Sequence, residues 1–126
     1  MKILLMTESR LDDQIDDLVT DIQSAAPEIE EVKRMELVRK TFPGFHDVLI
    51  FVGEGIEIAI IEILIKEGIK WGIKGVKKKL AEPVVISIFG LDGIPYAAAK
   101  VSSSGEVEHL DVQKMPKRNP LPTHLL

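Results

Sequence analysis

The sequence contains no cysteine, no long run of uncharged apolar residues and no metal-ligand spacing among its histidines. Without cysteine, disulfide bonds, thiolate nucleophiles and cysteine-bound zinc are excluded, and a cytoplasmic, reducing environment is expected. The longest apolar stretch, 56–76, carries six acidic or basic side chains, so it does not predict a membrane-spanning helix. The apolar run at the N-terminus is short and soon followed by acidic residues, which predicts a first β-strand rather than a signal peptide.

Motifs that could carry catalysis are weak. His46, His109 and His124 fall in a turn, an exposed strand and the C-terminal segment, without the spacing of a metal site. The acidic run at 12–17 suits the first turn of a helix, where it favours the positive end of the macrodipole. The G-x-G at 53–55 lacks the third glycine of a dinucleotide-binding turn. We therefore expect a protein that is not an enzyme and has no cofactor, metal or small-molecule substrate.

Length and composition predict one globular domain. The chain has 126 residues, of which 45% are hydrophobic and 29% charged, which is typical of a folded domain rather than of disorder. The formal net charge is −4, so the overall field does not attract nucleic acid. We expect a single domain over 1–113 and a proline-rich, extended C-terminal tail over 114–126.

The periodicity of apolar residues predicts a mixture of helices and strands. One-sided spacing predicts an amphipathic helix from Leu11 to Ala26, and lysines at every fourth residue favour helix over strand in 56–80. Strands are expected at 2–6, 47–52, 84–89, 96–101 and 106–112. The ambiguous segment 28–40 is interpreted as one or two short strands. This order predicts an α+β fold: a ferredoxin-like βαββαβ core with an added C-terminal hairpin or meander, and two helices on one face of a mainly antiparallel sheet.

The second half of the long helix forms the strongest basic patch. Its predicted interaction face consists of Lys66, Lys70, Trp71, Lys74, Lys77 and Lys78, followed by Lys79. Such a face suits phosphate backbones or an anionic membrane surface. Alternatively, lysines near a helix C-terminus complement the macrodipole and keep an apolar helix in solution. The acidic first helix of one protomer could also meet this basic helix in another protomer or in a partner.

The first half of the same helix is apolar on nearly every side. Such a helix must be buried by its own sheet, by another helix or by a partner. The predicted apolar interaction residues are Ile56, Ile60, Ile63 and Leu64. Glycines cost helix stability, so those at 68, 72 and 75 suggest the close approach of another backbone. A homodimer is the expected default assembly, although a helix buried within a monomer explains the same residues.

Several features between 42 and 108 occur in the order of a known family. They are the Pro43-Gly44 turn, the strand 47–52 with Gly53-Glu54-Gly55, the apolar helix ending in Lys77-Lys78-Lys79, and a hairpin with Asp92-Gly93. In this pattern the chain resembles the effector-associated constant component family of bacterial conflict systems. The resemblance implies a non-enzymatic adaptor that accompanies variable effector proteins.

The leading hypothesis is therefore a protein-interaction module, an adaptor with a protein partner in a bacterial defence system. One alternative is an antitoxin or immunity-type partner protein. Another is a peripheral binder of anionic membrane or nucleic acid through the lysine-rich helix face.

Overall fold

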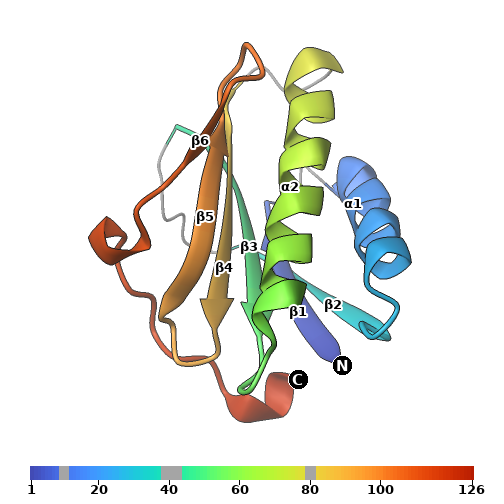
Figure 1. Ribbon diagram of the computed structural model, residues 1–126, viewed down its shortest axis with the longest axis vertical. Helices are drawn as coiled ribbons and strands as arrows, with labels where there is room; N and C mark the ends of the chain where they lie inside the picture. The colour runs from blue at the N-terminus through green and yellow to red at the C-terminus, as the bar shows by residue number, and fades with distance from the viewer. Residues whose placement is uncertain (9–11, 38–43, 79–81) are drawn as a thin grey trace.

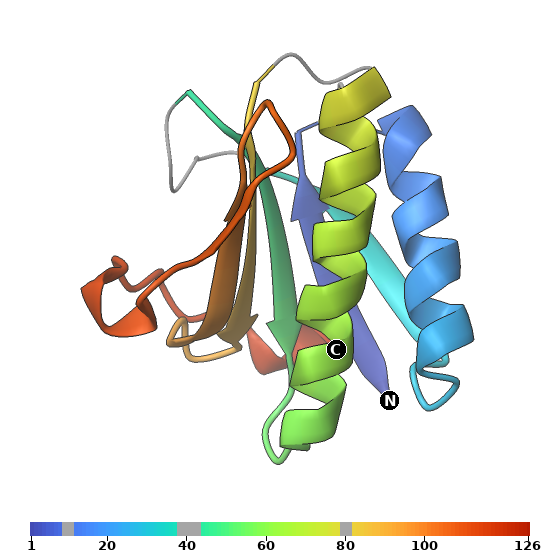
Figure 2. The same cartoon turned by 45° about the horizontal axis from the view of Figure 1, so that its top comes forward.

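The computed structural model describes residues 1–8, 12–37, 44–78 and 82–126; Leu11, Pro43 and Lys79, used above, lie outside these ranges. Within the described residues, six strands form one mixed sheet and two helices lie side by side on one of its faces (Figure 1, Figure 2). The helices are α1 (Asp12–Ala25) and α2 (Ile58–Lys78). The strands are β1 (Lys2–Thr7), β2 (Glu31–Glu36), β3 (His46–Val52), β4 (Val84–Gly90), β5 (Pro95–Val101) and β6 (Val107–His109). The α+β class is confirmed.

The strand order is β2-β1-β3-β4-β5-β6, which differs from the expected ferredoxin-like core. In that core the parallel strands of each βαβ unit are separated by an inserted strand. Here β1 is the direct parallel neighbour of β2, and β3 is the direct parallel neighbour of β4. The two βαβ units meet along the antiparallel pair β1 and β3. The ferredoxin-like prediction is wrong because both topologies share one order of elements along the chain, and only tertiary packing decides which strands become neighbours.

The helix-covered face holds the larger core. Alternate residues of the central strands, such as Leu5 and Ile50, point to this face and are fully buried. The first helix contributes Ile15, Leu18 and Ile22, the one-sided row that the sequence predicts. None of the helices in the described part of the chain is long and apolar enough to cross a bilayer.

Two glycines allow α2 to lie close to the sheet. A Cβ atom at Gly68 would stand 2.7 Å from Cγ2 of Ile86 on β4, and one at Gly72 would stand 3.1 Å from Cγ2 of Val101 on β5. The sequence predicts a close approach at these glycines, and the atoms that approach them are side chains of the sheet rather than another backbone. These contacts fix the distance between the helix layer and the sheet.

The opposite face of the sheet is covered by the C-terminal segment. Phe51 and Phe89 stack on this face with ring centroids 5.5 Å apart. Met115 is buried in the same cluster, and Leu121 and Leu125 pack against it. Figure 1 shows this segment in red. It passes from β6 to the end of the molecule at which the N-terminus also lies.

Backbone hydrogen bonds hold this segment in place. The N–H of Leu121 donates to the carbonyl of Leu91 at 2.8 Å, and the N–H of Arg118 donates to the carbonyl of Gly93 at 3.1 Å. The residues from 114 to 126, whose prolines predict an extended tail, therefore pack on the domain. Their apolar side chains need the cover that the open sheet face provides.

Candidate interaction surface

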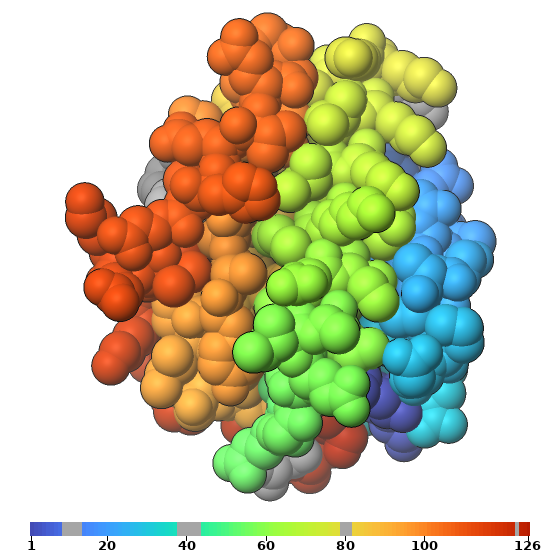
Figure 3. Space-filling model, in the orientation of Figure 1, coloured from blue at the N-terminus to red at the C-terminus, as the bar shows by residue number. Residues whose placement is uncertain are grey.

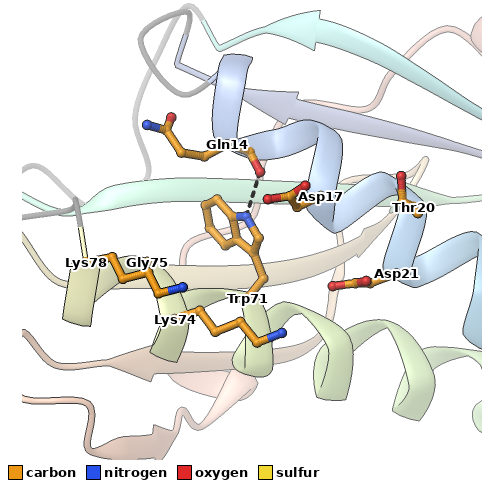
Figure 4. A pocket seen from close by; sticks show the side chains of 8 residues that line it. All are labelled: Gln14, Asp17, Thr20, Asp21, Trp71, Lys74, Gly75 and Lys78. Atoms are coloured by element: carbon orange, nitrogen blue, oxygen red, sulfur yellow. Dashed lines mark hydrogen bonds between the residues drawn. The ribbon is translucent and has the colours of Figure 1, made fainter.

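A groove of about 460 Å³ opens between α1 and α2, on the side of the helix layer away from the sheet. In the space-filling view the surface of α2 lies directly beside that of α1, so the two helices form one outer layer (Figure 3). Both helices contribute to the groove. Its lining residues are Gln14, Asp17, Thr20, Asp21, Trp71, Lys74, Gly75 and Lys78 (Figure 4).

Trp71 lies at the bottom of the groove and joins the two helices. Its side chain is only 5% exposed, and its indole Nε1–H donates a 2.8 Å hydrogen bond to the backbone carbonyl of Gln14 on α1. Buried tryptophan needs such a partner for its N–H group. The sequence places Trp71 in an interaction face, and the structure places it mainly in the contact between α1 and α2.

The two walls of the groove carry opposite charge. Asp17 and Asp21 lie one turn apart on α1, and Lys74 and Lys78 lie one turn apart on α2, so each pair shares one side of its helix. Figure 4 shows both aspartate side chains directed toward the space between the helices. Among the described residues, no ion pair within 4 Å joins these aspartates to these lysines. All four charges are therefore available to a binding partner.

The remaining predicted lysines continue the basic wall along α2. Lys66, Lys70 and Lys77 are all exposed. Lys70 Nζ lies 3.6 Å from Glu67 Oε1, one turn earlier, and the lysine side chain is 55% exposed. The Glu67 side chain is only 12% exposed, so the lysine head group stays in solvent while its partner is largely buried. The lysine row is thus a solvated face, and the structure leaves it accessible for binding.

The apolar residues predicted for interaction are mostly accounted for by the chain itself. Ile60 and Leu64 are 3% and 0% exposed and belong to the core between α2 and the sheet. Ile56 and Ile63 are partly buried and pack against the same core. In contrast, Ile58 at the start of α2 is 73% exposed, although the sequence does not distinguish it from the neighbouring isoleucines. The all-round apolar character of this segment follows largely from burial by the sheet and α1.

Sequence reasoning missed a group of buried polar side chains at the ends of β1 and β3. His46 Nδ1 lies 3.9 Å from Glu8 Oε2, and their side chains are 6% and 12% exposed. Asp47 next to them is fully buried. Nearby, Lys100 Nζ stands 5.1 Å from the centre of the Phe45 ring, a cation–π distance. Glu8 and His46 are 38 positions apart in the sequence, so no local spacing could have linked them.

No set of three histidine, aspartate or glutamate side chains in the described ranges is arranged to hold a metal ion. The comparison with known proteins adds no family: neither a protein-family model nor a curated protein sequence matches this chain. The feature of this structure that bears on function is therefore the charged helix layer, the outer faces of α1 and α2 with Asp17, Asp21, Lys74 and Lys78.

Proposed function

We propose that this protein is a non-enzymatic interaction module that binds a protein partner through the outer face of α1 and α2. The observation that carries the proposal is the pair of oppositely charged walls on either side of Trp71, with no ion pair across them within the described residues. Charge rows of this kind orient a partner and raise its association rate more than they raise affinity. The pattern-level resemblance noted above supports the role of an adaptor that accompanies effectors in a bacterial conflict system.

The same surface suits the role of an antitoxin or immunity-type protein, because proteins of that class also act by binding to the surface of another protein. Such a partner would carry both acidic and basic groups, since a purely acidic surface would meet repulsion from Asp17 and Asp21. The two protein-binding roles differ in the partner's identity and share the contact surface.

A different class of function is the binding of anionic membrane or nucleic acid. The exposed lysine row on α2 favours it. Asp17 and Asp21 oppose it, because they lie beside that row and repel phosphate groups. For this reason a protein partner is the better-supported reading of the groove.

The experiment compares the recovery of partners by wild type and by Lys74→Glu plus Lys78→Glu, which reverses the charge of the basic wall, at physiological salt, from the source organism. The matched control is Lys114→Glu plus Lys117→Glu, which reverses the same number of exposed charges in the C-terminal segment, outside the helix layer. We expect a stoichiometric protein that is recovered by wild type and control and loses at least about tenfold in affinity, roughly 1.4 kcal/mol, with the helix variant.

Equal recovery by all three proteins would remove the helix layer from the proposal. Binding to phosphatidylserine vesicles or to duplex DNA at low salt, abolished by the same helix variant, would instead support the membrane or nucleic-acid class.

A further inference from the structure

We propose that the groove between α1 and α2 binds one helix of a protein partner, and that the charges of this helix are segregated into a basic half and an acidic half. This inference rests on the proposed function, since it states the chemistry of the partner that the same surface binds. The observation behind it is the order of the charges along the groove, which follows from the opposite directions of the two helices.

The two helices run in opposite directions. Strands β1 and β3 are antiparallel, and the helix after each of them leads to a parallel neighbouring strand, so α1 and α2 are antiparallel as well. The hydrogen bond from the Trp71 indole to the Gln14 carbonyl places these two residues at one level along the helices. From that level, rising residue numbers lead one way along α1 and the other way along α2 (Figure 4).

The charges are therefore separated along the groove. The groove has an acidic end, with Asp17 and Asp21, and a basic end, with Lys74 and Lys78. At a rise of about 1.5 Å per residue, Asp17 and Lys74 differ in level by roughly 9 Å, and Asp21 and Lys78 differ by roughly 21 Å. This separation accounts for the absence, among the described residues, of an ion pair within 4 Å between these aspartates and lysines.

The side of α2 that faces α1 changes sign at the same level. Glu67, Trp71, Lys74 and Lys78 are spaced by four, three and four residues, so they lie along one side of the helix. Glu67 precedes Trp71 and so lies toward the acidic end, where its carboxylate has Lys70 Nζ at 3.6 Å. Both helices thus place carboxylates toward the acidic end of the groove.

A helix is the occupant that suits this groove. The backbone N–H and C=O groups in the middle turns of α1 and α2 are bonded within each helix, so the groove offers no backbone partners to an extended chain. A bound helix satisfies its own backbone groups and presents only side chains. Its side chains one turn apart are separated by about 6 Å along the axis, as are the two charges at each end of the groove. About 14 helical residues span the roughly 21 Å between the outermost charges.

Charge complementarity states what this helix carries. Basic side chains on one half of it meet the acidic end of the groove, and acidic side chains on the other half meet the basic end. A helix with alternating charges would bring like charges together at both ends, which disfavours its binding. A uniformly acidic or uniformly basic helix would be repelled by one end. The groove therefore selects a partner by the order of its charges.

The test uses two synthetic alanine-based helical peptides of about 16 residues as probes. One carries lysines in its first half and glutamates in its second half, all on one side, and the other carries the same residues in alternation. The alternating peptide forms more glutamate–lysine pairs within its own helix, so lower helicity cannot explain weaker binding by it. We expect the segregated peptide to bind wild type at least about fivefold more tightly at low salt, measured by fluorescence anisotropy, and the difference to shrink as salt is raised.

Charge reversal in the protein supplies matched variants. Asp17→Lys plus Asp21→Lys places lysines at both ends of the groove, and Lys74→Glu plus Lys78→Glu places carboxylates at both ends. Each double variant should bind the segregated peptide at least about tenfold more weakly than wild type. The fourfold variant that combines both pairs has the net charge of wild type. It should bind the segregated peptide as tightly as wild type does, in the opposite direction.

The direction of binding is measured with a nitroxide label on the lysine end of the segregated peptide. In wild type the label should broaden the amide signals around Asp21, and in the fourfold variant those around Lys78, because the lysine end follows the carboxylates. Unspecific attraction to the charged surface would broaden both regions alike. As a control outside the helix layer, Lys114→Glu plus Lys117→Glu should bind and orient the peptide as wild type does.

Equal binding of the two peptides would overturn the inference. So would a direction that does not reverse in the fourfold variant, or the absence of any binding at low salt. In each case the proposed function stands if Lys74→Glu plus Lys78→Glu still loses a stoichiometric protein in the recovery experiment. It falls too if no protein responds to these charges.

Discussion

The two faces of the sheet are covered in different ways, and the difference explains where the interaction surface lies. One face is covered by two regular helices, whose inner sides fill the core and whose outer sides present charges at a fixed spacing. The other is covered by an irregular C-terminal segment held by a few leucines and backbone hydrogen bonds. A helix repeats every 3.6 residues, so it can bury one side and arrange the other in rows. An irregular segment has no regular repeat, so it cannot present a row of evenly spaced side chains to solvent.

The largest effect is expected at the attachment of the C-terminal segment. Gly93 has φ +84°, and a Cβ atom there would stand 1.9 Å from the carbonyl oxygen of Arg118. Gly93→Ala combines a strained backbone with a clash that displaces the segment, so we expect a loss of about 3 kcal/mol in the free energy of unfolding. Urea denaturation measures it.

The matched control is Gly55→Ala. Gly55 also has a positive φ, +75°, but among the described residues no atom beyond its two chain neighbours lies within 4 Å of its Cβ position. Gly55→Ala should therefore lose only the free energy of the strained backbone conformation, about 1–2 kcal/mol. Equal losses in the two variants would mean that the contact with Arg118 contributes nothing.

A smaller effect is expected on the helix-covered face. Gly68→Ala gains up to about 1 kcal/mol of helix propensity but forces Ile86 to move, and overpacking typically costs about 1–3 kcal/mol. The net result should be a loss of about 1 kcal/mol in thermal or urea unfolding. Gly72→Ala meets only a 3.1 Å contact with Val101 and should be close to neutral. The reverse ranking would show that α2 does not pack most closely at Gly68.

The smallest effect is expected on the second face and has the opposite sign. Ser87 on β4 is fully buried, and its hydroxyl has no hydrogen-bond partner among the described residues. An unsatisfied buried hydroxyl costs about 1–3 kcal/mol, whereas Ser87→Ala leaves a void of only one atom. We expect a gain of about 0.5–1 kcal/mol in urea unfolding, with exposed Ser103→Ala unchanged. A loss at Ser87 would indicate that its hydroxyl has a bonding role.

Much of the secondary structure could be predicted because its signals are local. The row of Ile15, Leu18 and Ile22 predicts the inner side of α1, and the lysine spacing predicts that 58–78 is helical despite its many isoleucines. The candidate site was predicted only in part. The sequence predicts the lysine face, but it assigns the acidic run at 12–17 to the first turn of a helix. Nothing local indicates that Asp17 and Asp21 share a groove with Lys74.

Trp71 shows why the same residue can support two interpretations. From the sequence it lies in the middle of a basic stretch and suggests a surface contact, yet its indole N–H bonds a carbonyl that is 57 positions away. The prolines of the segment 114–126 predict an extended tail. Its docking depends on Gly93 and on the open sheet face, both distant in sequence.

The sequence by itself determined the class of the fold, the approximate bounds of most helices and strands, and the presence of a basic helix without a recognisable catalytic motif. These features depend on residues within a few turns of one another. Only the tertiary structure decided the strand order, the covering of the second face and the meeting of the acidic and basic helices. Those depend on which distant surfaces bury each other best, and the free energy of that burial has no local signature in the chain.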